Sequence, residues 1–177
     1  MLSGTEHFVE LAEGRSRVVK VTLPPAFGLI SCVTSTPIAN VRNSPSFTVR
    51  RKQIESVRAT PLEYLSRWIL VNEVFQDDVR LESVILWDCG LVSLSISQPQ
   101  YHGRPATSRE IESNLLRDGW TLCSKEASGT VFYNYAHKVL AVDVLPRNCY
   151  MNEGSFLPFD VILQRPGLEL EDFLELY

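Results

Sequence analysis

The sequence predicts an α+β fold on three observations. Two capping boxes, Thr60 to Glu63 and Thr107 to Glu110, each mark the start of a helix. Short runs rich in β-branched residues lie before, between and after these helices. The runs follow one another in pairs instead of alternating with helices, which favours an antiparallel first sheet over βαβ units.

Size and composition restrict the class of protein. The 177 residues fit one domain, and 45% hydrophobic with 21% charged residues is typical of a globular chain. A net charge of −4 argues against nucleic-acid and anionic-membrane partners. Runs of about 18 apolar residues and a signal peptide are absent from the sequence, so no membrane partner is expected. Four irregularly spaced cysteines and three scattered histidines do not form a zinc pattern. We therefore expect reduced thiols in a cytoplasmic protein.

The first third of the chain is predicted to contain two strands and a loop. The strands are "EHFVELAE" and "RVVKVTL", the second ending at Pro24-Pro25. Residues 31–58 are rich in Ser, Thr, Pro, Asn and basic residues, so we expect a long basic loop there. Such a loop is either simply solvated or a surface for an anionic partner.

The first helix is predicted over "TPLEYLSRWILVNEVF", with proline at its first position. Leu62, Leu65 and Ile69 would form its buried face, and Glu73 falls within about 20° of Leu62 on that face. A carboxylate is therefore expected to continue the buried stripe, where it would need a partner.

The rest of the chain is predicted to hold a hairpin, a connector, a helix and several strands. "VRLESVILW" and "LVSLSIS" flank a turn at Asp88-Cys89-Gly90. The connector "QPQYHGRPA" precedes the second helix, and strands and a short C-terminal helix follow it. These features suggest an N-terminal lobe over 1–97, a hinge-like connector over 98–106 and a small C-terminal lobe over 107–177.

Two charged residues lie where strand and helix cores should be apolar. Lys20 is inside "VVKVT" and Glu73 is on the helix, so a buried ion pair between them would satisfy both. The alternative is that the Lys20 side chain extends to solvent and that Glu73 turns outward at the helix end.

Three further polar residues stand out near the C-terminus. Asp143 ends an apolar run, Asn148 follows five residues later, and Asp160 lies in the next apolar run. Carboxylate and carboxamide oxygens are ligands suited to Mg²⁺. Phosphoryl transfer needs such ligands, a carboxylate near the attacking hydroxyl, and a lysine on the phosphates.

These residues give the chain a resemblance to protein kinases. "DVLPRN", from Asp143 to Asn148, resembles the D-x-x-x-x-N catalytic loop, and Asp160 in "FDVI" resembles the metal-binding Asp of D-F-G. Lys20 in "VVKV" is similar to the lysine of V-A-I-K, and Glu73 to its helix partner. The resemblance implies Asp143 as catalytic base and Asn148 and Asp160 as Mg²⁺ ligands.

The resemblance also covers the nucleotide and the rest of the fold. "SGTEHFV", with Gly4 and Val9, is similar to a reduced glycine-rich loop, which together with Lys20 and Glu73 would bind ATP or another nucleotide. Over nearly its whole length, the chain resembles the kinase-like domains of polyvalent proteins, large multidomain proteins of phages and mobile elements. A minimal two-lobed kinase-like fold is implied, with an antiparallel N-terminal sheet, one helix and a much reduced C-terminal lobe.

Departures from the kinase pattern keep other functions open. Ala141-Val142 replaces the usual His-Arg, Leu145 stands where a lysine is usual, and Val161-Ile162 replaces Phe-Gly. The chain is therefore interpreted as an ATP·Mg²⁺-binding domain that transfers a phosphoryl group to an unknown protein or small-molecule acceptor. An inactive pseudokinase serving as an interaction or regulatory module is the second interpretation, and an unrelated α+β binding domain is the third.

Overall fold

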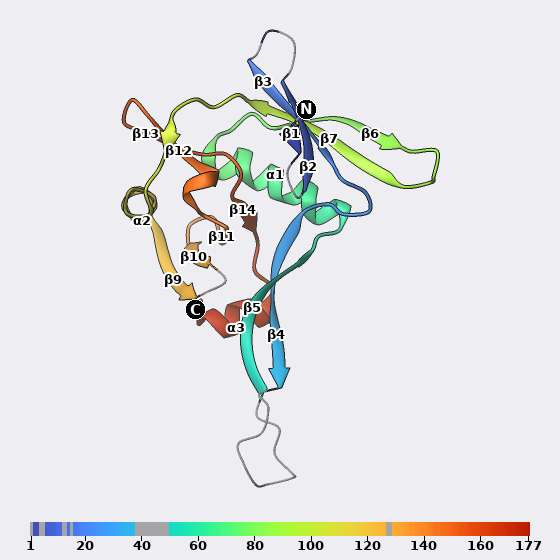
Figure 1. The fold of residues 1–177 in the computed structure, drawn as a ribbon. Helices are drawn as coiled ribbons and strands as arrows, with labels where there is room; N and C mark the ends of the chain where they lie inside the picture. The colour runs from blue at the N-terminus through green and yellow to red at the C-terminus, as the bar shows by residue number, and fades with distance from the viewer. Residues whose placement is uncertain (1, 4–5, 12–13, 15, 38–49, 127–128) are drawn as a thin grey trace.

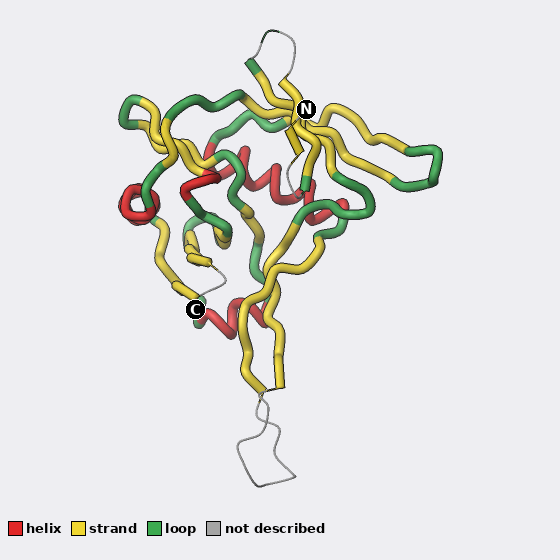
Figure 2. Tube along the Cα trace, viewed as in Figure 1, coloured by secondary structure: helices red, strands yellow, loops and turns green. Residues whose placement is uncertain are grey.

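The computed structural model describes residues 2–3, 6–11, 14, 16–37, 50–126 and 129–177 (Figure 1). Within these ranges it contains three α-helices and mostly antiparallel sheets, which confirms the predicted α+β class. Figure 2 shows the strands surrounding helix α1 (Pro61–Phe75), which crosses the middle of the molecule. No helix in the described part is long and apolar enough to cross a membrane.

The N-terminal sheet has five strands in the order β1-β2-β3-β7-β6, and all neighbours are antiparallel. Its strands are β1 (Leu2–Ser3), β2 (His7–Leu11), β3 (Arg17–Thr22), β6 (Arg80–Leu86) and β7 (Val92–Pro99). Lys20 is on the central strand β3, opposite Val9 of β2 and Ile96 of β7. The predicted turn between β6 and β7 is confirmed, since Trp87 N donates to Leu91 O and Gly90 has the positive φ that such a turn requires.

Helix α1 begins at the predicted capping box, but it buries a different face from the predicted one. Thr60 Oγ1 accepts from Glu63 N, and the Glu63 carboxylate accepts from Thr60 N. The predicted core residues Leu62 and Ile69 are 75% and 64% exposed. The buried side chains are Tyr64, Arg67, Trp68, Leu70 and Val71. The aromatic pair Tyr64 and Trp68, one turn apart, decides which face packs against the sheet because aromatic rings bury the most area.

Residues 31–58 are not the predicted loop over most of their length. Strands β4 (Leu29–Pro37) and β5 (Arg50–Arg58) pair antiparallel along nine residues each, and the loop prediction was wrong for them. The hairpin extends away from the body of the molecule (Figure 1), so both faces of its outer part can carry polar residues. Such strands lack the apolar alternation that identifies a half-buried strand. Residues 38–49 of the predicted loop lie outside the described residues.

The C-terminal half holds two smaller sheets and two helices. One sheet has the order β14-β11-β10-β9 and the other the order β13-β12-β8. The elements are β8 (Arg104–Pro105), α2 (Ser108–Arg117), β9 (Trp120–Glu126), β10 (Gly129–Asn134), β11 (Val139–Val142), the 3₁₀ turn η1 (Pro146–Asn148), β12 (Cys149–Asn152), β13 (Ser155–Pro158), β14 (Ile162–Gln164) and α3 (Leu168–Leu174). The second predicted capping box, Thr107 to Glu110, starts α2.

One hydrophobic core joins the two halves. It contains Trp68 of α1 and Ile96 of β7 together with Phe132 of β10 and Val161 next to β14. Because these side chains come from both halves of the chain, residues far apart in the sequence are held beside one another where the N-terminal sheet meets β11 and β14.

Candidate functional site

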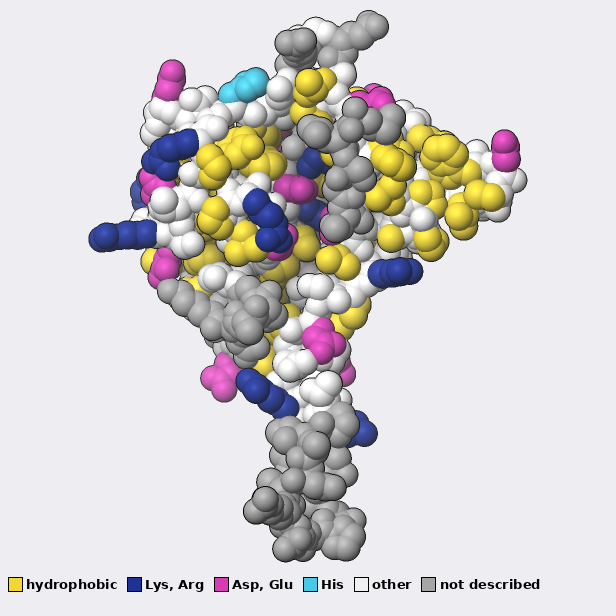
Figure 3. Space-filling model, in the orientation of Figure 1, with side chains coloured by type: hydrophobic (Ala, Val, Ile, Leu, Met, Phe, Trp, Pro, Cys, Tyr) yellow, Lys and Arg dark blue, Asp and Glu magenta, His cyan; other side chains and the backbone are white. Residues whose placement is uncertain are grey.

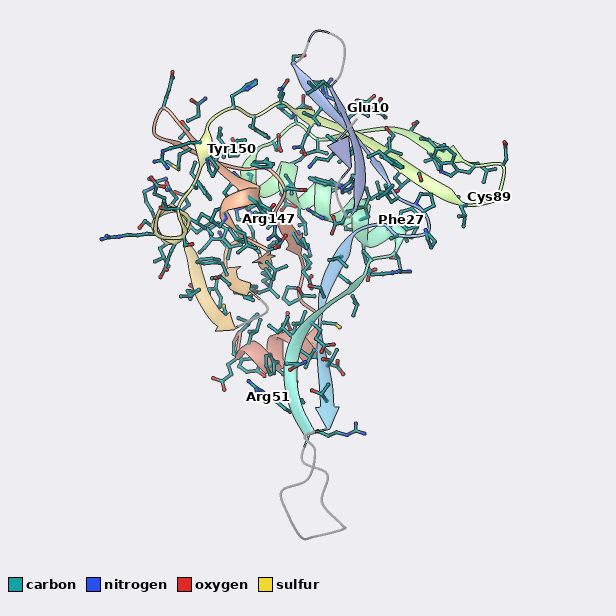
Figure 4. All side chains as sticks on the ribbon, in the orientation of Figure 1. Glu10, Phe27, Arg51, Cys89, Arg147 and Tyr150 are labelled. Carbon is teal, nitrogen blue, oxygen red and sulfur yellow. The ribbon has the colours of Figure 1, made fainter. Side chains whose placement is uncertain are left out.

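Five of the predicted site residues line a single cavity of about 230 Å³. Four of them are polar, namely Lys20 on β3, Asp143 after β11, Asn148 in η1 and Asp160 before β14, and the fifth is Val9 on β2. Up to 140 positions separate the four polar residues in the sequence. The remaining lining residues are Glu6, His7, Arg67, Arg147 and Ile162. Figure 3 shows acidic and basic side chains side by side near the centre of this face, and Figure 4 places Arg147 there.

Two buried cations hold the Asp160 carboxylate. Lys20 Nζ and Arg67 Nη2 each lie 3.1 Å from Asp160 Oδ1. Burial alone would raise the pKa of Asp160, but the attraction of Lys20 and Arg67 outweighs it and lowers that pKa below its usual value. Asp160 is therefore ionised at neutral pH, and its side chain is still 33% exposed toward the cavity.

Lys20 is almost fully enclosed. Its side chain is 7% exposed, and Nζ lies 5.3 Å from the centre of the Trp68 ring as well as beside Asp160. Burial lowers the pKa of Lys20, and the Asp160 carboxylate partly restores it. The two contacts fix an ammonium group at the cavity wall, where it can meet an anion without reorganising.

Asp143 and Asn148 also line the cavity and are fixed to each other. Asn148 Nδ2 donates to the backbone carbonyl of Asp143 at 2.7 Å and to its Oδ2 at 2.8 Å, and Arg147 Nη2 donates to Oδ1 at 2.6 Å. Asp143 has a φ of 54°, an uncommon conformation for a residue other than glycine. Such strain persists only where neighbouring contacts impose it, and it is frequent at functional sites.

The backbone places Asn148 beside the segment that carries Asp160. Phe159 N donates to Asn148 O at 3.0 Å, and Cys149 pairs with Pro158 across the β12–β13 hairpin. Asp143, Asn148 and Asp160 are spaced five and then twelve residues apart in the sequence. The fold thus brings one carboxamide and two carboxylates to the same cavity.

Arg67 is a site residue that the sequence analysis missed. Its side chain is 3% exposed, and its guanidinium group donates to Asp160 O, Val161 O and Asp160 Oδ1. A further contact of 3.4 Å reaches Glu6 Oε2. These bonds fix the backbone on which Asp160 stands. A helical pattern built on Tyr64, Trp68 and Val71 would have indicated that Arg67 lies on the buried face.

His7 is a second residue that the prediction missed. It is 4% exposed, and its Nε2 lies 2.9 Å from the hydroxyl oxygen of Tyr64. Burial, reinforced by the positive charge of Lys20, lowers the pKa of His7 from 6.5 to about 3. The ring is therefore neutral at pH 7 and adds no charge to the cavity.

Glu73 does not lie at this site, and the predicted ion pair with Lys20 is not formed. Its side chain is 47% exposed and lies 3.5 Å from Arg165, beside a separate cavity of about 360 Å³ between α1 and β14. The reason is that α1 buries a different face from the predicted one, as described above. Arg67 lies on the buried face, and Glu73 does not. Val9 lines the site as the sequence suggested, whereas Gly4 lies outside the described residues.

The side chains of the cavity could hold a metal ion only if a bound ligand supplied further oxygen atoms to it. Among the described residues, no group of three or more His, Cys, Asp or Glu side chains is arranged to hold a metal ion. The cavity offers carboxylates and the Asn148 carboxamide, whose Nδ2 already binds Asp143. Mg²⁺ is commonly held by one or two carboxylates with substrate phosphates completing its shell, and this set is compatible with that arrangement.

No protein-family model, curated protein or solved structure matches the chain, so the interpretation of the site rests on its own geometry.

Proposed function

We propose that the protein binds ATP with Mg²⁺ in this cavity and is a kinase-like phosphotransferase. The observation that carries the proposal is the convergence of Lys20, Asp143, Asn148 and Asp160 on one cavity. A lysine, a base carboxylate and two metal-binding side chains are the parts that phosphoryl transfer in protein kinases requires.

The order of the elements also supports the proposal. In protein kinases the phosphate-binding lysine is on a strand that precedes a helix. Here β3 carries Lys20, the hairpin β4–β5 and then α1 follow it along the chain, and β6 and β7 complete an antiparallel sheet with β3. Residues 1–97 and 107–177 would then correspond to two lobes, with 98–106 as the connector between them.

The charges of the cavity favour a nucleotide that arrives with its metal ion. Three cations and three carboxylates pair with one another: Lys20 with Asp160, Arg67 with both Asp160 and Glu6, and Arg147 with Asp143. A triphosphate alone would add several negative charges to a site that is nearly neutral. A bound Mg²⁺, held by Asn148 and Asp160, would offset the charge of the phosphates and polarise the terminal phosphoryl group.

The protein's own side chains would bind the phosphates, accept the proton and position the reacting groups. Lys20 would bind the phosphates, and Asp143 would accept the proton of the attacking hydroxyl. Asn148 and Arg147 would hold the Asp143 carboxylate in place through the bonds described above. Arg67 would position Asp160 without touching the substrate.

Thermal denaturation with and without ATP·Mg²⁺, followed by an assay for ADP, tests the proposal. A ligand at about 100 times its Kd raises the melting temperature of a domain of this size by about 5–10 °C. The parent should show this shift and release ADP. Asp143→Asn should keep the shift and lose ADP release, and no shift in the parent would refute nucleotide binding.

An inactive nucleotide-binding module is the second candidate. The observation that favours it is that both Lys20 and Arg67 are bound to Asp160 Oδ1, the carboxylate that a metal would need. A thermal shift with ATP·Mg²⁺, together with ADP release no faster in the parent than in Asp143→Asn, would select this candidate.

A further inference from the structure

A second chamber lies on the other side of Asp143. It has a volume of about 270 Å³ and shares Glu6, Asp143, Arg147 and Ile162 with the first chamber. The two chambers are therefore adjacent along these four residues, and Lys20 lines only the first of them.

The second chamber differs chemically from the first. Seven described residues line the second chamber but not the first, and none of these seven carries a charge. They are Leu29, Ser31, Ile54, Ser56, Thr130, Val131 and Val142. Four of these side chains are apolar, and the other three carry hydroxyl groups that offer hydrogen bonds. Such a lining suits a small ligand that has both an apolar part and hydrogen-bonding groups, and among the described lining residues it gives a phosphate no cation besides Arg147.

The hairpin β4–β5 builds one wall of this chamber and is fixed in place. Ser31 N donates to Gln164 Oε1 at 2.6 Å, and Gln164 Nε2 donates to Ser31 O at 2.9 Å. This pair of bonds joins β4 to β14. Ile54 of β5 also packs in one cluster with Val131, Val142 and Ile162 of the C-terminal sheet. Ser31 and Ser56 are directly opposite each other in the hairpin.

We propose that the second chamber binds the phosphoryl acceptor, and that this acceptor is a small alcohol with an apolar body. This inference rests on the proposed function. The volume of about 270 Å³ is just below the usual range for small-molecule pockets, about 300–1,000 Å³, so the acceptor must be small, and the chamber is too small for a folded protein segment. A hydroxyl group at the junction would meet Asp143 on one side and the terminal phosphate of ATP on the other.

The proposed reaction transfers the terminal phosphoryl group of ATP to the acceptor hydroxyl. The acceptor hydroxyl oxygen forms a bond to the terminal phosphorus of ATP, and the bond from that phosphorus to the bridging oxygen breaks. ADP leaves with the electron pair of the broken bond. The hydroxyl proton passes to the Asp143 carboxylate and from there to solvent, so the products are a phosphate monoester, ADP and a proton.

Ser56 and Ser35 supply a matched pair of variants for the test. Both are exposed serines on the hairpin, and only Ser56 lines the chamber. Hexanol, cyclohexylmethanol and benzyl alcohol serve as probes, with saturation-transfer NMR for binding and ADP release for turnover. The parent and Ser35→Trp should bind at least one probe and release ADP faster in its presence. Ser56→Trp should lose both responses because its indole fills the chamber, while its calorimetric binding of ATP·Mg²⁺ is retained.

Three outcomes would overturn the inference. The first is a parent that binds ATP·Mg²⁺ while none of the three alcohols binds or increases ADP release. The second is Ser56→Trp responding to the alcohols as Ser35→Trp does. The third is alcohol binding without any increase in ADP release. Failure of the parent to bind ATP·Mg²⁺ in calorimetry would instead refute the proposed function itself, and with it the acceptor role of the chamber.

Discussion

At the scale of single residues, the site depends on buried charges that satisfy one another. Lys20 and Arg67 are both nearly inaccessible and share the Asp160 carboxylate, while His7 beside them stays neutral. Removing one member of such a set leaves another charge unpaired in a poorly solvated place, which costs more free energy than the pair itself contributes.

Asp160→Asn should therefore destabilise the protein. The loss of a partner from a fully buried pair costs about 3–5 kcal/mol, and the 33% exposure of Asp160 reduces our expectation to about 2–3 kcal/mol. Urea denaturation measures this change in the free energy of unfolding. Asp78→Asn, which breaks an exposed pair with Arg17 and Arg80, is the control and should cost much less. Equal losses in the two variants would contradict the account.

His7 should make the stability depend on pH. Its pKa falls from 6.5 to about 3 on folding, so between these values the unfolded chain binds more protons than the folded one. Stability should decrease as pH falls through this window, by up to about 1.4 kcal/mol per pH unit.

Replacing His7 tests that contribution. Urea denaturation of the parent and of His7→Gln between about pH 6.5 and 5 should show a shallower dependence on pH in the variant. His102→Gln, which changes an exposed histidine, is the control substitution. An unchanged dependence in His7→Gln would show that this ring is not buried in its neutral form.

At the scale of elements, helix α1 decides which side chains reach the site. The aromatic pair Tyr64 and Trp68 faces the sheet, so Arg67 reaches Asp160 and Glu73 turns toward Arg165. The capping box could be predicted because it is a local pattern of four residues. The buried face could not, because Leu62 and Ile69 compete with Tyr64 and Trp68 for the same role and only the surrounding core resolves the competition.

Substitutions at these two helix positions should differ strongly. Arg67→Leu removes four contacts of the guanidinium group and leaves Asp160 and Glu6 without it, so a loss of about 3 kcal/mol in the free energy of unfolding is expected. Glu73→Leu, on the exposed side of the same helix, should change that free energy by less than about 1 kcal/mol. Chemical denaturation compares them, and a larger loss for Glu73→Leu would contradict the orientation of α1.

The hairpin β4–β5 shows a second limit of prediction from sequence. Strand pairing such as Thr34 with Gln53 and Thr36 with Arg51 stabilises a segment whose composition resembles that of a loop. In contrast, the strands of the N-terminal sheet were recognisable, because Val18, Val19 and Val21 give that run a high β-propensity.

At the scale of the whole molecule, one core joins the N-terminal sheet to the C-terminal sheets and so brings the site together. The sequence indicated Lys20, Asp143, Asn148 and Asp160 as unusual polar residues, and all four line the cavity. It did not indicate Arg67 or His7, since their importance arises from contacts with residues distant in the chain. The helical periodicity of Tyr64, Trp68 and Val71 can place Arg67 on the buried face, but it does not identify Asp160 as the partner of Arg67.

The charge balance of the assembled cavity predicts that nucleotide binding requires the metal ion. Chelating Mg²⁺ with EDTA should abolish the thermal shift caused by ATP, because the triphosphate would then enter a site whose three cations are already paired. Melting curves with ATP plus Mg²⁺ and with ATP plus EDTA measure this. A shift of the same size in EDTA would contradict the proposed role of Asn148 and Asp160.

Calorimetric titration of ATP·Mg²⁺ into the parent and into Lys20→Met tests the central claim most directly. Lys20→Met removes the ammonium group and keeps the Arg67–Asp160 pair, and its melting curve without ligand verifies that it is folded. We expect the parent to bind one equivalent and Lys20→Met to have lost this binding. An absence of binding by the parent, or equally tight binding by a folded Lys20→Met, would contradict it.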